Sequence, residues 1–269
     1  MNDPSADQRP SIDRGTGAPT LVFLHYFSGA AASWQWVIEA LQSEFRCVAL
    51  DLPGFGRQMP LPQPSLATYS TFVAEAIKAL EIKQYVLIGH SMGGKIALQL
   101  ASDTTDQGLQ QVVLIAPSPP TQEPMPDDER QRLLENHPSP ANAATTVDSG
   151  AQQSLPEPQR STAIETHVQA ANSAWRWWLL DGMNHSIADR LDRIQAPVTV
   201  LASEDDPVIP FDTIQQEVLD RMPQAKLVKL VGLGHLMPLE DPDAVAEIIR
   251  QVAYATPAGG ARDRSLSVR

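Results

Sequence analysis

The sequence predicts an α/β fold, with a doubly wound, mostly parallel sheet and a helical insertion near the middle of the chain. Short apolar runs alternate with longer amphipathic segments, which is typical of strands that helices cover on both faces. The alternation stops between residues 117 and 192, where prolines are frequent and no convincing strand occurs. Strands and helices that alternate at this spacing favour a parallel sheet.

The strands expected in this sheet are short and mostly apolar on both faces. On the expected helix Tyr69–Leu80, the residues Val73, Ile77 and Leu80 share one face, and Thr68 is placed to cap its N-terminus. The six expected strands are Thr20–His25, Arg46–Leu50, Tyr85–Gly89, Gln111–Ala116, Val198–Ala202 and Lys226–Val231. The helices expected among them are Trp34–Gln42, Tyr69–Leu80, Met92–Ser102, Thr213–Arg221 and Ala244–Tyr254.

The break in the alternation predicts one core domain with a cap. Segments Asp127–Asn136 and Ala163–Leu180 have helical patterns, so a helical cap at 118–192 is expected to join core segments 19–117 and 193–255. The two ends, 1–18 and 256–269, are rich in Gly, Pro, Ser and charge and are expected to be disordered tails.

Composition limits the classes of function. The net charge of −12 argues against nucleic acid as a partner, because phosphate binding needs an excess of Lys and Arg. The chain has one cysteine, Cys47, within an apolar run, so a buried thiol is expected and a disulfide framework is excluded. No apolar stretch approaches the ~20 residues that span a membrane, and no signal peptide is evident. A soluble cytoplasmic protein without a membrane partner is therefore expected.

The segment Gly89-His90-Ser91-Met92-Gly93 carries the strongest chemical signal. An apolar strand runs directly into it and a helix follows, which is the context that the Gly-x-Ser-x-Gly turn requires. Such a turn projects the serine Oγ clear of the sheet, and the residues two positions before and after it must be small. We therefore expect Ser91 to be a nucleophile, with the positive end of the following helix favouring an oxyanion.

With this segment the chain resembles the α/β-hydrolase superfamily, over roughly residues 19–255. A serine nucleophile needs a base, and His235 is the one histidine that follows the last expected strand. The loop after strand Val198–Ala202 resembles the acid loop of the superfamily, where Asp precedes Pro, two apolar residues and another Pro. The resemblance favours Asp206 as the acid, and Asp205 remains an alternative.

The resemblance also implies an oxyanion hole made by the backbone N–H groups of Phe27 and Met92. Similar enzymes usually have Gly where this chain has Tyr26, so the side chain either faces the core or solvent, or reaches the pocket with its hydroxyl. Superfamily members usually begin with a two-stranded antiparallel hairpin. Because few residues precede Thr20 and many of them break strands, we expect that hairpin to be missing or vestigial, which leaves about six parallel strands.

Other residues have two interpretations. Trp175 and Trp178 share one face of an expected cap helix, where they either pack the cap onto the sheet or wall an apolar pocket. Lys95 is expected to extend to solvent. His25 and His90 look structural, while the histidines of the insertion are expected at its surface or within the lid.

These features predict a serine hydrolase that cleaves a small or medium carboxylic ester without a metal or organic cofactor. Lactones, thioesters and C–C bonds flanked by carbonyls suit the same triad, as does perhydrolase activity. An alternative of another class is a receptor or interaction protein that keeps the pocket without catalysis. The intact trio of Ser91, Asp206 and His235 argues against this last alternative.

Overall fold

Seven strands form one sheet in the computed structural model, which describes residues 11–255. Six of them are parallel, and the strand order is β1-β3-β2-β4-β5-β6-β7. The six expected strands are therefore confirmed as β2 to β7, and the α/β fold with them. The bounds are β1 Ile12–Arg14, β2 Thr20–Leu24, β3 Cys47–Leu50, β4 Tyr85–His90, β5 Leu109–Ile115, β6 Val198–Ser203 and β7 Lys226–Leu230.

Within the described residues, the strand that precedes β2 is β1, which pairs antiparallel with β3. This strand lies within the range 1–18 that was expected to be a tail, so that expectation is wrong for residues 12–14. Side-chain contacts add to the strand pairing. Asp13 of β1 forms an ion pair with Arg46 at 2.7 Å, and the hydroxyl of the preceding Ser11 donates to Asp51 at 2.6 Å. The rest of the expected tails, residues 1–10 and 256–269, lies outside the described residues.

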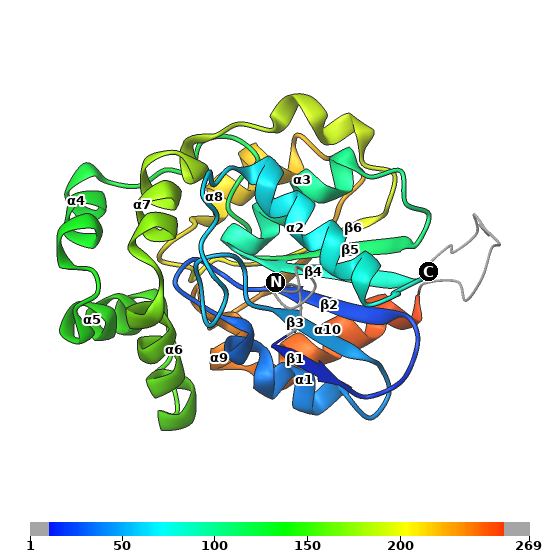
Figure 1. The fold of residues 1–269 in the computed structure, drawn as a ribbon, viewed down its shortest axis with the longest axis horizontal. Helices are drawn as coiled ribbons and strands as arrows, with labels where there is room; N and C mark the ends of the chain where they lie inside the picture. Colours follow the sequence, from blue (N-terminus) through cyan, green and yellow to red (C-terminus); the bar gives the residue numbers. More distant parts are fainter. Residues whose placement is uncertain (1–10, 256–269) are drawn as a thin grey trace, which may run out of the picture.

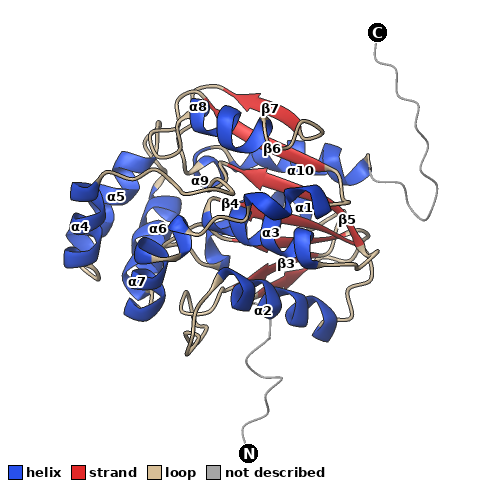
Figure 2. Ribbon diagram, turned by 90° about the horizontal axis from the view of Figure 1, so that it is seen from above, coloured by secondary structure: helices blue, strands red, loops and turns tan. Residues whose placement is uncertain are grey.

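Helices cover both faces of the sheet, as the buried strands require. Figures 1 and 2 show α2 (Leu66–Ala79) and α3 (Met92–Asp103) on one face, and α1 (Gln35–Leu41) and α10 (Pro242–Tyr254) on the other. Side chains of β2 alternate between the two cores: Val22 and Leu24 pack with the first pair of helices, and Leu21 and Phe23 pack with the second.

Helix α2 begins one turn earlier than its apolar pattern predicts. Its N-cap is Ser65, whose hydroxyl accepts from the Thr68 N–H at 3.1 Å, while the Thr68 hydroxyl accepts from the Ser65 N–H at 2.8 Å. Thr68 is thus the third residue of a reciprocal capping box and not the cap itself.

The insertion between β5 and β6 contains helices and no strand within the described chain, and Figure 1 shows its main helices, in green, gathered at one end of the sheet. The expected helix Asp127–Asn136 is α4, but the expected helix Ala163–Leu180 is divided into two, and one helix was not expected. The bounds are α4 Asp127–Asn136, α5 Pro140–Gly150, α6 Glu157–Gln169 and α7 Asn172–Leu180, followed by η3 Gly182–Asn184 and η4 Ala188–Arg193.

Three short elements complete the core after the insertion. They are α8 Phe211–Thr213 with η5 Ile214–Leu219, between β6 and β7, and α9 Met237–Glu240 before α10. A further short helix, η2 Ala31–Trp34, precedes α1. Within residues 11–255 no helix has the length and apolar character needed to cross a membrane.

Candidate active site

Ser91 lies at the sharp turn between β4 and α3. Its backbone has φ 51° and ψ −115°, a left-handed conformation that is costly for a residue with a side chain. The turn leaves no room beside it, because a Cβ on Gly89 would lie 2.4 Å from the Gly93 carbonyl oxygen and one on Gly93 would lie 2.5 Å from that of Leu24. The small residues predicted at these positions are therefore required by close backbone contacts.

Asp206, at the end of β6, is hydrogen-bonded to His235, which follows β7. The Nδ1 of His235 lies 2.9 Å from Oδ2 of Asp206, and both side chains are buried. The other carboxylate oxygen accepts from the N–H groups of Val208 and Ile209 at 2.8 and 2.9 Å. Asp205 is engaged elsewhere, since it accepts from the Gly232 N–H. Of the two candidate acids, Asp206 is the one in contact with the histidine.

Opposing effects act on the pKa of His235. Burial favours the neutral ring and lowers the pKa, whereas the charge and hydrogen bond of Asp206 raise it, as do the carboxylates of Glu123 and Glu240. The carboxylates prevail, so the pKa of His235 lies above its ordinary value. An imidazole in this setting is well suited to accept a proton, because the resulting cation is stabilised by Asp206.

The loop that carries His235 is bonded to the insertion. The His235 N–H donates to the Gly150 carbonyl, at the end of α5, at 2.8 Å. Glu240 accepts from the N–H groups of Gln152 and Gln153 as well as from Gly234. The position of the histidine therefore depends on the insertion and the core together.

His25 and His90 form hydrogen bonds with the backbone around the site, in agreement with their expected structural role. His90 donates from Nε2 to the His235 carbonyl at 2.8 Å, while His25 accepts from the Leu52 N–H and donates to the Tyr26 carbonyl. Burial lowers the pKa of His25 to about 4, so it is neutral at physiological pH.

A cavity of about 490 Å³ opens above Ser91 and is shared by the core and the insertion. Trp175 and Trp178, the two expected pocket residues, both line it, together with Tyr26 and Phe27. Its apolar lining also includes residues from the insertion and from the loops after β6 and β7: Pro124, Met125, Pro126, Leu133, Val147, Pro207, Val208 and Leu236.

Of the two residues expected to form an oxyanion hole, Phe27 lines this cavity and Met92 directly follows Ser91. Within the described residues, neither the Phe27 N–H nor the Met92 N–H donates to an acceptor of the protein. The left-handed residue in the first loop is Ser28, with φ 72°, so Tyr26 does not adopt the backbone angles that glycine would favour. The Tyr26 ring packs against His90, with ring centroids 5.0 Å apart, among apolar residues.

Aromatic contacts connect the cavity wall with the insertion. The Phe27 ring lies 4.3 Å from that of Trp175, on which His137 is stacked at 4.2 Å and His167 packs at 4.6 Å. His167 is fully buried within the insertion, so the expectation of a surface position is wrong for this residue. Trp177 of α7 stacks instead on Tyr69 of α2.

The fold and this geometry agree with a known family. A model of the alpha/beta hydrolase family matches residues 21–248. The chain belongs to the alpha/beta hydrolase family. One curated relative aligns over most of this chain. It is a poly(3-hydroxyalkanoate) depolymerase from Ectopseudomonas oleovorans, 30% identical over 268 residues, which cover 91% of this chain and 92% of the relative.

Other relatives of this alpha/beta hydrolase are more partial or more distant. The dihydrolipoyllysine-residue acetyltransferase component of an acetoin cleaving system from Cupriavidus necator is 39% identical over 105 residues; these are 39% of this chain but only 28% of that protein. The solved structure of an esterase from Exiguobacterium antarcticum superposes with a TM-score of 0.81 at 19% identity, covering 90% of this chain and 93% of the esterase, and shows the common fold.

Two buried charged residues beside the site were not recognised from the sequence of this family member. Glu123 lines the cavity and is 4% exposed, and Lys95 of α3 is fully buried. The expectation that Lys95 extends to solvent is wrong, because its ammonium donates to the carbonyls of Thr121 and Met183 at 2.7 and 3.0 Å. No motif marks Glu123, which follows a proline-rich loop after β5.

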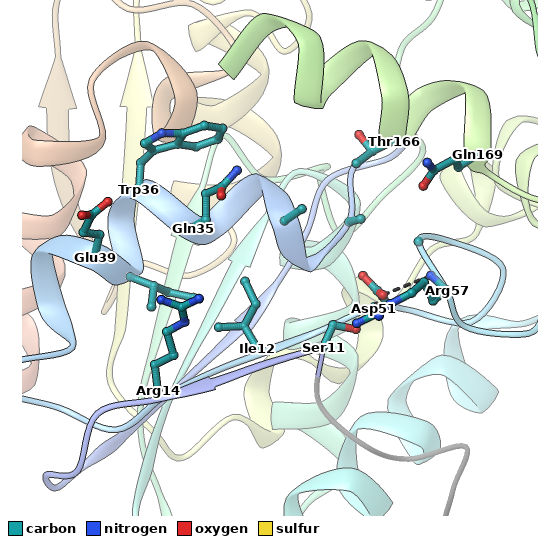
Figure 3. Close-up of a pocket in the computed structure, with 14 residues that line it drawn as sticks. Ser11, Ile12, Arg14, Gln35, Trp36, Glu39, Asp51, Arg57, Thr166 and Gln169 are labelled. Atoms are coloured by element: carbon teal, nitrogen blue, oxygen red, sulfur yellow. Dashed lines mark hydrogen bonds between the residues drawn. The ribbon is translucent and has the colours of Figure 1, made fainter. Parts of the chain in front are cut away.

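A second cavity, of about 480 Å³, lies apart from Ser91, Asp206 and His235 of this hydrolase (Figure 3). It is bordered by β1, α1, α6 and the loop after β3, and Asp51 lies at its floor. That carboxylate accepts from Ser11 and from the N–H groups of Ala31 and Arg57, so it organises these loops. Within residues 11–255 no group of three or more His, Cys, Asp or Glu side chains is arranged to hold a metal ion.

Proposed function

We propose that this protein is a serine esterase that cleaves a small or medium carboxylic ester through an acyl-enzyme intermediate. The observation that carries the proposal is the hydrogen bond between His235 and Asp206, at a cavity that the histidine shares with the strained Ser91. A nucleophile, a base and an acid on the loops after three parallel strands match the order and roles of a hydrolytic triad.

The proposed reaction has two halves. His235 takes the proton from Ser91 as Oγ attacks the ester carbonyl, and the N–H groups of Phe27 and Met92 hold the oxyanion. The carbonyl re-forms as the alcohol leaves with the proton from His235, and the acyl group stays on Ser91. Water then loses a proton to His235 and attacks the acyl-enzyme; as the acid leaves, His235 gives this proton to Ser91 Oγ, which restores the serine and the neutral base. Asp206 stabilises the imidazolium in both halves.

The cavity supports an ester with an apolar acyl or alcohol part. Its walls are formed by tryptophans, Leu133, Val147 and other apolar side chains, which the insertion supplies as a cap over the core. The polyester named in the depolymerase relative contains ester bonds of this chemical kind. The remaining alternatives, among them lactones, thioesters and C–C bonds, differ in the substrate and not in the proposed nucleophile.

A fluorophosphonate probe and a series of p-nitrophenyl esters test the proposal. The wild-type protein should be labelled and should turn over short and medium acyl esters, and Ser91→Ala should abolish both. Ser102→Ala is a matched control, because Ser102 lies on the same helix with its hydroxyl bonded to the Gln99 carbonyl. Labelling or turnover that survives Ser91→Ala would refute the proposal, as would a wild-type protein that shows neither.

A further inference from the structure

Glu123 is a buried acid whose role the triad does not explain. It lines the cavity that holds Ser91 and His235, yet its Oε2 has no hydrogen-bond partner within the described residues. The neighbouring Ser118 hydroxyl interacts with this carboxyl group and tends to lower its pKa. An unsatisfied buried polar atom costs about 1–3 kcal/mol, so a carboxyl oxygen without a full complement of partners beside the Ser91 cavity calls for a compensating contact.

The loop that carries Glu123 is held in place by buried groups. Lys95, on the helix that follows Ser91, donates to the Thr121 carbonyl two residues before Glu123. The Glu123 N–H and the Lys95 ammonium share the Met183 carbonyl of the insertion as acceptor. A carboxyl group fixed at this depth by three elements is preorganised, which is what recognition of a polar group in an apolar pocket requires.

The charge state of Glu123 limits what it can bind. Burial raises its pKa and Asp206 adds to this effect, whereas Ser118, Lys95 and His235 oppose it; the pKa remains above its ordinary value. Burial likewise lowers the pKa of Lys95 to about 8, although the charge of Glu123 opposes this shift. A neutral group that can both donate and accept therefore suits this carboxyl group better than a second carboxylate, which the nearby charge of Asp206 would disfavour.

We propose that Glu123 is a specificity-determining residue that binds a hydroxyl group of the substrate. A hydroxyl is neutral and can both donate and accept, so it satisfies a carboxyl group in either protonation state. The three residues that follow it in the cavity wall, Pro124, Met125 and Pro126, are apolar, and an alkyl chain alone leaves Glu123 without a partner. Resting on the proposed esterase activity, this inference narrows the substrate class to esters with a hydroxyl group close to the scissile bond.

Matched ester pairs test the inference. One pair, ethyl butanoate and ethyl 3-hydroxybutanoate, places the hydroxyl on the acyl side, and the other, propyl butanoate and 3-hydroxypropyl butanoate, places it on the alcohol side. In at least one pair the wild type should show a kcat/KM about tenfold higher for the hydroxylated ester, as one added hydrogen bond in a buried site provides.

Variants of Glu123 separate hydrogen bonding from charge. Glu123→Leu should reduce the preference to about one, while Glu123→Gln, which can still donate and accept, should keep it within about threefold. Glu135→Leu, which removes an exposed carboxylate from α4, is the control for the loss of one negative charge. Thermal melts establish that each variant is folded.

Each outcome bears on the inference separately from the esterase proposal. A wild type that cleaves plain and hydroxylated esters equally well in both pairs overturns the inference, whether or not Glu123→Leu folds. Equal losses for both members of a pair in Glu123→Leu also overturn it, because they indicate an effect on the triad alone. Absence of turnover for all four esters together with absence of fluorophosphonate labelling refutes the esterase proposal instead.

Discussion

Replacing Asp206 by Asn tests the triad through the proton on His235. In the wild type, Nδ1 of His235 donates to Oδ2 of Asp206, which leaves Nε2 free to accept the proton of Ser91. The Oδ1 of the aspartate accepts from the Val208 and Ile209 N–H groups. An asparagine keeps these two bonds with its carbonyl oxygen and therefore presents its NH₂ group to the histidine. Nδ1 must then accept, the proton moves to Nε2, and the base can no longer take a proton.

The expected loss in Asp206→Asn is about 10⁴-fold in kcat, or about 5.5 kcal/mol of transition-state stabilisation, by analogy with the same exchange in a known Ser-His-Asp triad. The protein should fold normally, because the buried backbone contacts remain. The assay is hydrolysis of a p-nitrophenyl ester at pH 8, with fluorophosphonate labelling rates as a second readout. Asp205→Asn is the matched control and should lose less than about threefold. A loss below tenfold in Asp206→Asn, or a larger loss in Asp205→Asn, would refute the assignment of the acid.

Three further predictions concern the base and the insertion. His235 must be neutral to accept a proton and its pKa is raised, so kcat/KM, measured from pH 5 to 9, should fall on the acidic side with a midpoint above 6.5; a midpoint at or below 6.5 contradicts this environment. Trp175→Ala should lower the free energy of unfolding by about 3–5 kcal/mol in urea titrations and shift the substrate preference toward longer acyl esters. An unchanged chain-length profile would contradict a role of Trp175 in shaping the pocket. His167 is buried with both ring nitrogens unpartnered within the described chain, and burial lowers its pKa to about 4. Between pH 6.5 and 4 the unfolded chain therefore binds a proton at His167 that the folded chain does not, so the free energy of unfolding falls as the pH falls. His167→Phe should reduce the loss of unfolding free energy between pH 7.5 and 5 by about 2 kcal/mol. The exposed control His185→Phe should leave that loss unchanged.

The sheet could be predicted from the sequence because each parallel strand is buried on both faces and reads as an apolar run. β1 could not be predicted, since only Ile12 of its three residues is apolar and an ion pair between Asp13 and Arg46 helps to hold it. The division of Ala163–Leu180 into α6 and α7 was also missed. No glycine or proline marks the break at 170–171.

The candidate triad was predictable for a related reason. Catalytic side chains on this fold follow the carboxyl ends of strands, and the turn at Ser91 has strict steric demands that appear directly as glycines. Glu123 has no such signal. Its burial follows from the position of Lys95 and the Met183 carbonyl, which are far apart in the sequence and meet only after the insertion has packed onto α3.

The insertion therefore does more than cover the cavity, because it contacts two parts of the proposed catalytic site through the backbone and through aromatic rings. The Gly150 carbonyl accepts from the N–H of His235, so α5 helps to fix the base. The ring of Phe27, one of the two proposed oxyanion donors, packs tilted against Trp175, and His137 is stacked on the same tryptophan. A change in the packing of the insertion must then alter the oxyanion donor as well as the pocket wall. Substrate preference and catalytic rate are coupled in this arrangement, and insertion variants should change kcat together with KM.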